Sequence, residues 1–222
     1  VGLQNPGVEQ VIAQELPRLR KCFHKPVMAN ISGFSVEEYV ETCRMLNDQQ
    51  DIGWFEVNIS CPNTPDLTDL QQSDTFTNLI SPLKSAQARL ADEHGTYVPL
   101  VVKISPDLYD NELRSLCKVC MEQHVDGITC TNTTVSRDVV HGMMHANEWG
   151  GLSGQPLFHR STRILKLVSE MVEHSIPLIG VGGISNAVQA REKIDAGASL
   201  LQIYTALIYK GPHVVKEIVS RM

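Results

Sequence analysis

The sequence predicts a parallel α/β fold of the (β/α)₈ barrel type, with about six of the eight βα units present. Short apolar runs alternate with longer amphipathic runs along the whole chain, which is typical of repeated βα units and a parallel sheet. Six units are more than most small doubly wound sheets contain, whereas a complete barrel takes about 250 residues. We therefore expect one barrel domain, residues 1–222, that is incomplete at its N-terminal side.

The first expected element is a helix at 7–21, and because no strand precedes it we interpret it as the end of a unit whose strand is absent. Each strand is then expected where a short apolar run is bounded by Gly, Pro, Asn or Asp. These runs are "PVMANI" at 26–31, "WFEVNIS" at 54–60, "VPLVVKIS" at 98–105, "GITCTN" at 127–132, "IPLIGVGG" at 176–183 and "SLLQIYTA" at 199–206.

Each strand is followed by a segment whose apolar residues recur at helical spacing. One of these helices has a clear start, because Ser35 with Glu38 three residues later is a capping-box pattern. The helices after the six strands are expected at 36–47, 75–92, 109–124, 161–174, 186–196 and 211–222.

Composition and charge exclude several classes of protein. The hydrophobic content is 42% and the charged content 20%, as in an ordinary soluble globular domain. No run approaches the roughly 20 apolar residues of a membrane-spanning helix, and the N-terminus lacks the pattern of a signal peptide. Because the net charge is −6 and the basic residues are scattered, we expect a cytoplasmic protein without a nucleic-acid partner.

The six cysteines are irregularly spaced, which favours reduced thiols over disulfides. Cys117 and Cys120 form a CxxC motif, but they share helical spacing with neighbouring leucines, so we interpret them as the buried face of a helix. His141 and His145 lie four residues apart in a glycine-containing segment without a third ligand at the usual spacing. We expect no metal site there.

Polar residues or glycines close all six predicted strands, at the ends where a barrel places its active site. The pattern predicts a ligand site on this face, and "GVGGIS" before a helix in the penultimate unit offers backbone N–H groups to a phosphate. A second glycine-rich segment, "GGLSG", lies at 150–154. The strand-end residues are Asn30, Asn58 with Cys61 after it, Lys103, Thr131 with Asn132, Gly182 with Gly183, and Tyr204 with Thr205.

Lys103 stands in an apolar strand, where an unpaired charge would be costly, so we expect it to face an anion. The residues alone leave three alternatives open. Lys103 could face a bound ligand, form a structural ion pair with Asp107 or Asp126, or act as a Schiff-base nucleophile.

Five motifs in register resemble the dihydroorotate dehydrogenase family over essentially the whole chain. They are "NISCPNTPDLTDLQ", "VKISPD", "DGITCTNTTVSRD", "GGLSGQPL" and "IPLIGVGGISNAVQAREKIDAGASLLQIYTALIYKGP". The resemblance implies an FMN-containing barrel that oxidises dihydroorotate to orotate in pyrimidine synthesis.

The resemblance also implies roles for individual residues. Cys61 corresponds to the base that takes a proton from C5 of dihydroorotate while a hydride leaves C6 for FMN, and the loop after Cys61 would cover the substrate. The FMN contacts implied are Asn30, Asn58, Lys103, Thr131, Gly154, Gly183, Tyr204 and Thr205. The substrate contacts implied are Asn58, Asn63, Asn132, Thr133 and the backbone at Leu3.

The motifs mix two classes of this family, so the second electron acceptor stays open between a quinone, fumarate and NAD. "NISCPN" resembles the soluble class, whereas "NTTVSRD" and "LQIYTALIYKGP" resemble the quinone-reducing class, which would place the protein at the inner membrane. A homodimer is compatible with either class. Two other readings stay open, namely a non-catalytic remnant of a barrel and a related flavin enzyme such as dihydropyrimidine dehydrogenase.

Overall fold

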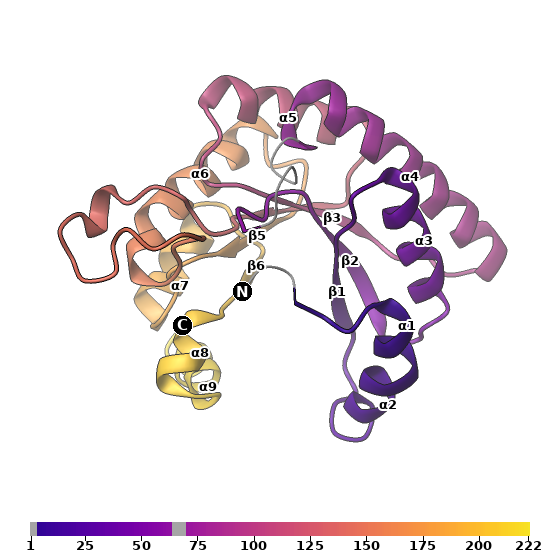
Figure 1. Ribbon diagram of the computed structural model, residues 1–222, viewed down its shortest axis with the longest axis horizontal. Helices are drawn as coiled ribbons and strands as arrows, with labels where there is room; N and C mark the ends of the chain where they lie inside the picture. The colour runs from indigo at the N-terminus through magenta and orange to yellow at the C-terminus, as the bar shows by residue number, and fades with distance from the viewer. Residues whose placement is uncertain (1–3, 64–69) are drawn as a thin grey trace.

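The structure is a computed structural model that describes residues 4–63 and 70–222. These residues form one six-stranded parallel sheet in which each strand pairs with the next along the chain. Figure 1 shows that the sheet is curled, so the predicted partial barrel is confirmed. The strands are β1 (Val27–Ile31), β2 (Ile52–Asn58), β3 (Leu100–Ile104), β4 (Gly127–Cys130), β5 (Leu178–Val181) and β6 (Leu200–Gln202).

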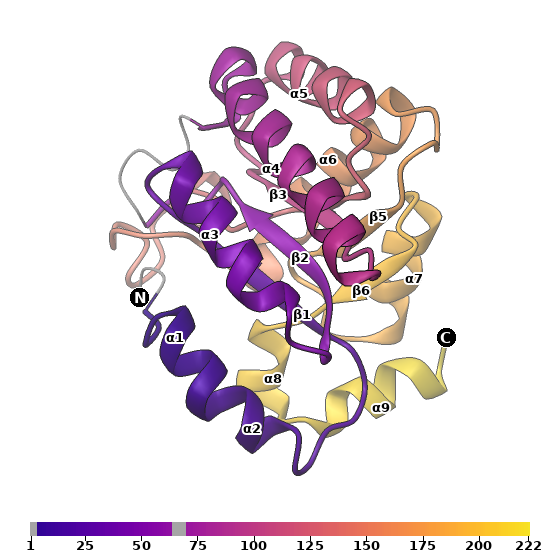
Figure 2. The same ribbon diagram turned by 90° about the vertical axis from the view of Figure 1, so that its right-hand side faces the viewer.

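Helices cover the outer, convex face of this sheet (Figure 1), and Figure 2 shows α3 and α4 lying side by side over the first strands. Among the described helices, none combines the length and the apolar character that crossing a bilayer requires. The covering helices are α3 (Val36–Asn47), α4 (Ser73–His94), α5 (Asp110–Glu122), α6 (Phe158–Met171) and α7 (Ala187–Asp195).

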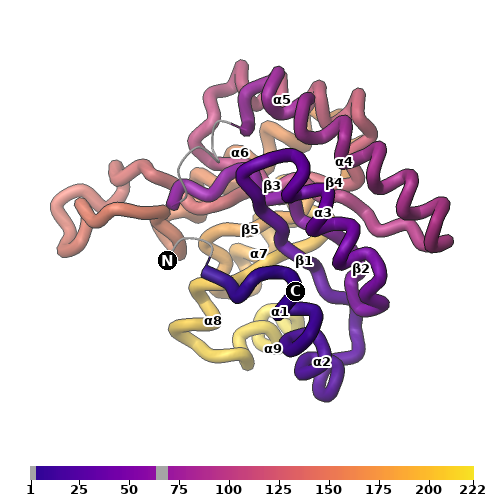
Figure 3. Tube along the Cα trace, turned by 45° about the vertical axis from the view of Figure 1, so that its right-hand side comes forward, coloured from indigo at the N-terminus to yellow at the C-terminus, as the bar shows by residue number. Residues whose placement is uncertain are grey.

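The predicted first helix is a continuous helical segment that contains a π-helical stretch. It comprises α1 (Val8–Gln10), η1 (Val11–Glu15) and α2 (Leu16–Leu19). The tube in Figure 3 shows that the long connection between β4 and α6 projects from the body of the molecule. Two 3₁₀ turns, η3 (Asp138–Val140) and η4 (Gln155–Leu157), lie in this connection.

The main hydrophobic core lies between the sheet and its helices. Alternate strand residues such as Phe55 and Ile128 face helix residues such as Leu79 and Leu113, and all of them are buried. Cys117 and Cys120 on α5 are buried in the same core, which confirms that this CxxC motif is a packing face.

The start of α3 agrees with the capping pattern in one half only. Ser35 Oγ accepts a hydrogen bond from the backbone N–H of Glu38 at 3.3 Å, as a helix N-cap does. The Glu38 carboxylate, however, accepts from the N–H of Phe34 at 2.7 Å, one residue earlier than the capping box requires. Glu38 thus fixes the turn before the helix.

The predicted strand at 199–206 was wrong in its second half. Pairing of β6 with β5 stops at the Val181–Gln202 pair, because two glycines with positive φ, Gly182 and Gly183, follow β5 directly. The following residues form the helix α8 (Thr205–Lys210), and the predicted helix at 211–222 is confirmed as α9 (His213–Ser220). Short apolar runs do not distinguish strand from helix by periodicity alone, which explains the error.

Candidate functional site

A cavity of about 1040 Å³ opens at the C-terminal ends of the strands. Its wall comes from segments far apart in sequence, chiefly 131–133, 151–157, 181–185 and 202–206. This is the face on which the sequence predicts a ligand site. Of the predicted site residues, Lys103, Thr131, Asn132, Thr133, Gly154, Gly183, Tyr204 and Thr205 line it.

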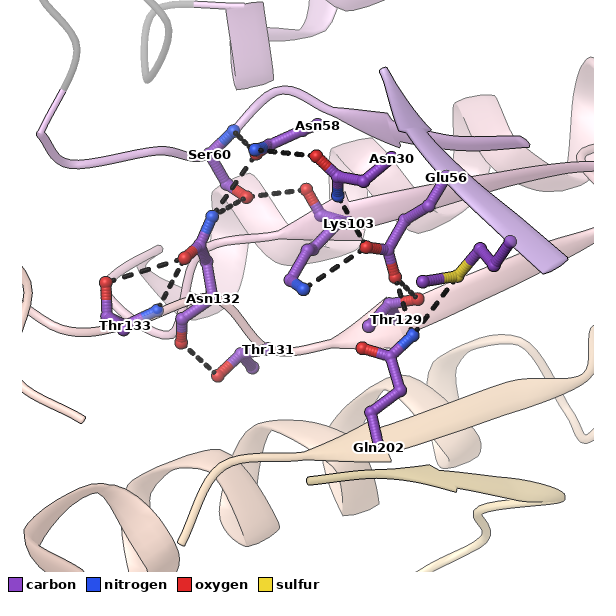
Figure 4. Close-up of polar contacts among 11 residues, drawn as sticks. Asn30, Glu56, Asn58, Ser60, Lys103, Thr129, Thr131, Asn132, Thr133 and Gln202 are labelled. Atoms are coloured by element: carbon purple, nitrogen blue, oxygen red, sulfur yellow. Dashed lines mark hydrogen bonds and ion pairs between the residues drawn. The ribbon is translucent and has the colours of Figure 1, made fainter. Parts of the chain in front are cut away.

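A buried carboxylate, Glu56 on β2, lies at the centre of a polar network beside the cavity (Figure 4). Its two oxygens accept hydrogen bonds from Asn30 Nδ2 at 2.6 Å, Thr129 Oγ1 at 2.7 Å and Gln202 Nε2 at 2.9 Å. Lys103 Nζ lies 3.2 Å from Glu56 Oε2 and completes the set. The network therefore joins side chains from β1, β2, β3, β4 and β6 in one inward-facing layer.

The environment of Glu56 keeps it ionised. Burial raises the pKa of its carboxyl, but the Lys103 charge and the hydrogen bonds from Thr129, Gln202 and Asn30 outweigh burial and hold the pKa below its ordinary value. The Glu56 side chain is 1% exposed and that of Lys103 is 17% exposed. Lys103 thus presents a positive charge at the cavity wall, and the buried Glu56 carboxylate behind it compensates that charge.

The predicted ion-pair partners of Lys103 were wrong. Asp107 instead accepts from Arg160 Nη1 at 3.1 Å and from Thr134 Oγ1, and it pins the start of the β4–α6 connection. Asp126 pairs with Lys84 at the opposite end of the strands. Both acidic residues lie near Lys103 in sequence, but the strand register places neither beside it.

Glu56, Thr129 and Gln202 are site residues that the sequence reasoning missed. A signal for Glu56 was present, because it stands two residues before Asn58 in the same strand, so the two side chains share a face. Glu56 and Lys103 also carry opposite charges, and each stands in an otherwise apolar strand. Only the register of β2 and β3 shows that the two side chains meet.

A second group of amides lies next to this network (Figure 4). Asn132 Nδ2 donates to Asn58 Oδ1 and to Ser60 Oγ, both at 3.2 Å, and Asn58 Nδ2 lies 3.4 Å from Asn30 Oδ1. Ser60 Oγ donates to the carbonyl of Lys103 at 2.7 Å. Asn30, Asn58 and Asn132 are therefore held in fixed orientations beside the lysine.

Cys61 follows this group directly and is buried, with 6% of its surface exposed. Two residues later, Asn63 Oδ1 accepts a hydrogen bond from the N–H of Gly151 in the cavity wall at 2.7 Å. Cys61 thus lies between two residues tied to the site, although Asn30, Asn58, Cys61 and Asn63 are not themselves among the cavity-lining residues. Leu3 and part of the predicted covering loop lie outside the described residues.

Glycine is required where the cavity wall passes close to α6. Gly183 has φ +78°, and a Cβ there would lie 2.5 Å from Phe158 Cβ, closer than side-chain atoms approach. Gly154 has φ +76°, and a Cβ there would lie 3.1 Å from Thr205 Cγ2. The glycines therefore leave backbone exposed along one side of the cavity.

The family model for dihydroorotate dehydrogenase matches residues 1–222. Curated relatives with the name "dihydroorotate dehydrogenase (quinone)" include those from Aeromonas hydrophila, 41% identical over 228 aligned residues and 100% of this chain, and Legionella pneumophila, 46% identical over 228 aligned residues and 99% of this chain. The relative from Vibrio parahaemolyticus is 49% identical over 170 aligned residues and 77% of this chain.

Among solved structures, a crystal structure of dihydroorotate dehydrogenase from Eimeria tenella in complex with ferulenol matches with a TM-score of 0.87 and 28% identity. The match covers 99% of this chain and 64% of that chain. The chain likewise spans 67% of the Aeromonas and Legionella relatives and 51% of the Vibrio relative.

Proposed function

The chain belongs to the dihydroorotate dehydrogenase family, and on that premise we propose that it oxidises dihydroorotate to orotate with FMN as cofactor. The observation that carries this proposal is the inward-facing layer around Glu56 and Lys103, which places a cation and ordered amides beside a glycine-walled cavity. Such a constellation is suited to a flat, polar, phosphorylated cofactor and a small polar substrate.

The residues of the cavity fit FMN in size and in chemistry. A volume of about 1040 Å³ is slightly above the usual range for small-molecule and cofactor sites, so the cavity has room for FMN. Gly182 and Gly183 carry no side chain that would shield their backbone from a phosphate, and Lys103 offers a positive charge to an electron-rich ring. The residues that would hold FMN are Asn30, Asn58, Lys103, Thr131, Gly154, Gly183, Tyr204 and Thr205.

The substrate would meet the amide group next to this cavity. Amide and hydroxyl side chains both donate and accept, so they match the alternating N–H and C=O groups on the edge of dihydroorotate. We assign this role to Asn58, Asn63, Asn132 and Thr133. The contacts of Asn132 with Asn58 and Thr133, and of Asn63 with Gly151, support it because they fix the amide orientations.

Cys61 is the proposed general base. When bound, FMN would supply the acceptor for the hydride from C6 of dihydroorotate. Cys61 would take the proton from C5, and its 6% exposure would keep bulk water away from that transfer. Asn63 and Ser60 on either side of Cys61 would hold the thiol in place through their contacts with Gly151 and Asn132.

A quinone is the proposed second electron acceptor, because the curated relatives carry that word in their names. Since such quinones dissolve in the bilayer, this acceptor would require contact of the protein with the membrane surface. Side-by-side steady-state assays with a quinone, fumarate and NAD would identify the acceptor.

The test of the proposed function is the colour of the protein and its response to substrate. The purified protein should show flavin absorbance, and this absorbance should bleach when dihydroorotate is added without air. Dihydrouracil, which lacks the carboxylate of dihydroorotate, should bleach it at least tenfold more slowly. A colourless protein, or one that dihydrouracil reduces equally fast, would count against the proposal.

Replacing the thiol tests the role of Cys61. Cys61→Ala should slow anaerobic flavin reduction near pH 7 by about 10²–10⁴-fold, the usual contribution of a general base. The FMN content should stay unchanged, because Cys61 is not one of the residues assigned to hold FMN. Cys61→Ser should be faster than Cys61→Ala, and its rate should rise with pH, since the serine oxygen can take the substrate proton only after its own hydroxyl proton has been lost. Full-rate reduction in the alanine variant would refute the assignment.

A further inference from the structure

Lys193 on α7 is a buried cation that the proposed chemistry does not use. It is 0% exposed, and its Nζ donates to Ser161 Oγ at 2.6 Å and lies 3.3 Å from the carbonyl oxygen of Val181. No ion pair among the described residues includes it, and its ammonium also lies 5.4 Å from the centre of the Phe158 ring. Burying an ammonium group with only neutral partners costs free energy, so we expect Lys193 to serve a function.

Lys193 acts on the two peptide groups that end β5. It meets the Val181 carbonyl directly, and Ser161 Oγ, to which it donates, lies 3.1 Å from the Gly182 carbonyl oxygen. In a trans peptide the N–H points away from the C=O of the same unit. The N–H groups of Gly182 and Gly183 are therefore turned away from Lys193, and both glycines line the cavity.

The packing around these peptide groups leaves little freedom. Gly182 has φ +104°, and a Cβ there would lie 2.8 Å from Ser161 Oγ. Gly183 passes so close to α6 that a Cβ would lie 2.7 Å from the Cα of Phe158. The end of β5, the first turn of α6 and Lys193 thus form one tightly packed unit.

We propose that Lys193 is a positioning residue that strengthens the binding of a phosphate group at the Gly182–Gly183 turn. Lys193 fixes the carbonyls of Val181 and Gly182, directly and through Ser161, and polarises the N–H groups of the same two peptide units. Its positive charge also attracts the phosphate, because buried protein between them screens the charge only weakly. This inference rests on the proposed function in one respect, namely that the phosphate is that of FMN.

The proposal makes phosphate binding pH-dependent. Burial lowers the pKa of Lys193 to about 8, with Cys130 on β4 and Glu192 on α7 acting in the opposite direction. The other packed elements, α6 and β5, face it with the Ser161 hydroxyl and the Val181 carbonyl. A bound phosphate dianion would raise this pKa, so above pH 8 binding must take up a proton. FMN affinity should therefore fall as the pH rises from 7 to 9.

The experiment compares FMN with riboflavin, which has the same ring system but no phosphate. Dissociation constants are measured for the purified protein, for Lys193→Met, and for Lys166→Met as the control, because Lys166 is an exposed lysine on α6. At pH 7, Lys193→Met should bind FMN at least tenfold more weakly and riboflavin within twofold of the parent protein. Between pH 7 and 9, FMN affinity should decline in the parent protein and stay level in Lys193→Met.

A second variant protects the test against a folding defect. Ser161→Ala removes the link to Gly182 and should also weaken FMN binding selectively, while thermal unfolding reports whether each variant is folded. Equal FMN affinity in Lys193→Met and the parent protein, or an equal loss of both flavins in the folded variants, would overturn the role of Lys193 and leave the proposed function intact. A parent protein that binds neither flavin would overturn both.

Discussion

Glu56 is the residue on which the arrangement of the site most depends. Four side chains from four other strands contact its carboxylate, and one of them is the only cation in the network. Removing one partner of a buried ion pair leaves the other charge uncompensated in a poorly solvated place. Replacing Glu56 should therefore lower the stability of the protein and also displace the Lys103 side chain.

Glu56→Gln should lower the free energy of unfolding near pH 7 by about 2–4 kcal/mol, because Lys103 loses its counter-charge. The pKa of Glu56 is held below its ordinary value of 4.5, so its contribution is present above that pH and is lost as the pH falls further. The stability difference between the two proteins should shrink in acid. Denaturant unfolding from pH 3 to 7 measures this, with Glu170→Gln, a change at an exposed residue of α6, as the control. A pH-independent difference would contradict the assignment.

At the scale of elements, the packing of β5 against α6 requires the backbone after the strand to approach the helix closely. Gly183 has positive φ and contacts the backbone of Phe158, whereas Gly142, in the projecting β4–α6 connection, has nearly the same φ and open space around it. Comparing substitutions at the two glycines therefore separates two losses of unfolding free energy. One arises from the positive φ, and the other from the contact of a new side chain with Phe158.

Gly183→Ala and Gly142→Ala should therefore differ although their φ values are +78° and +77°. A left-handed conformation costs an alanine roughly 1–2 kcal/mol, which is the loss expected for Gly142→Ala. Gly183→Ala adds a contact of 2.5 Å with Phe158, so its loss of unfolding free energy should be at least twice as large, with weaker FMN binding. Thermal unfolding of the pair gives the comparison, and similar losses would mean that the turn relaxes freely.

At the scale of the whole molecule, the two ends of the strands have different roles, one in ligand binding and the other in stability. The cavity and its amides lie at the C-terminal ends of the strands, whereas Asp126, directly before β4, organises the opposite end. Its carboxylate accepts from Lys84 Nζ at 3.1 Å, Gln87 Nε2 at 3.0 Å and Tyr97 OH at 2.5 Å. In barrels this N-terminal face serves stability.

Asp126→Asn should destabilise the protein without changing flavin binding. The amide cannot accept from every donor now directed at the carboxylate, so the free energy of unfolding should fall by about 1–3 kcal/mol. The FMN dissociation constant should stay within twofold of the parent value, since the substitution lies at the far end of the strands. A larger change in FMN affinity would show that the two ends are coupled.

Local pattern was sufficient to locate most elements and part of the site. Strand and helix periods placed all six strands, and the polar strand ends marked the cavity side, because the C-terminal ends of parallel strands meet on one face. Local pattern failed at β6, where a short apolar run suits either state and only the lost pairing with β5 stops the strand.

What the sequence by itself determined was the alternation of strands and helices, the edge of the sheet that carries polar groups, and the residue types gathered there. Only the tertiary structure decided which charges meet. Glu56 pairs with Lys103 although 47 positions separate them, and Lys193 is buried although the similar lysine Lys166 is exposed. The physical reason is that periodicity is a local property of the chain, whereas charge pairing and burial depend on strand register and on the packing of α7 against its neighbours.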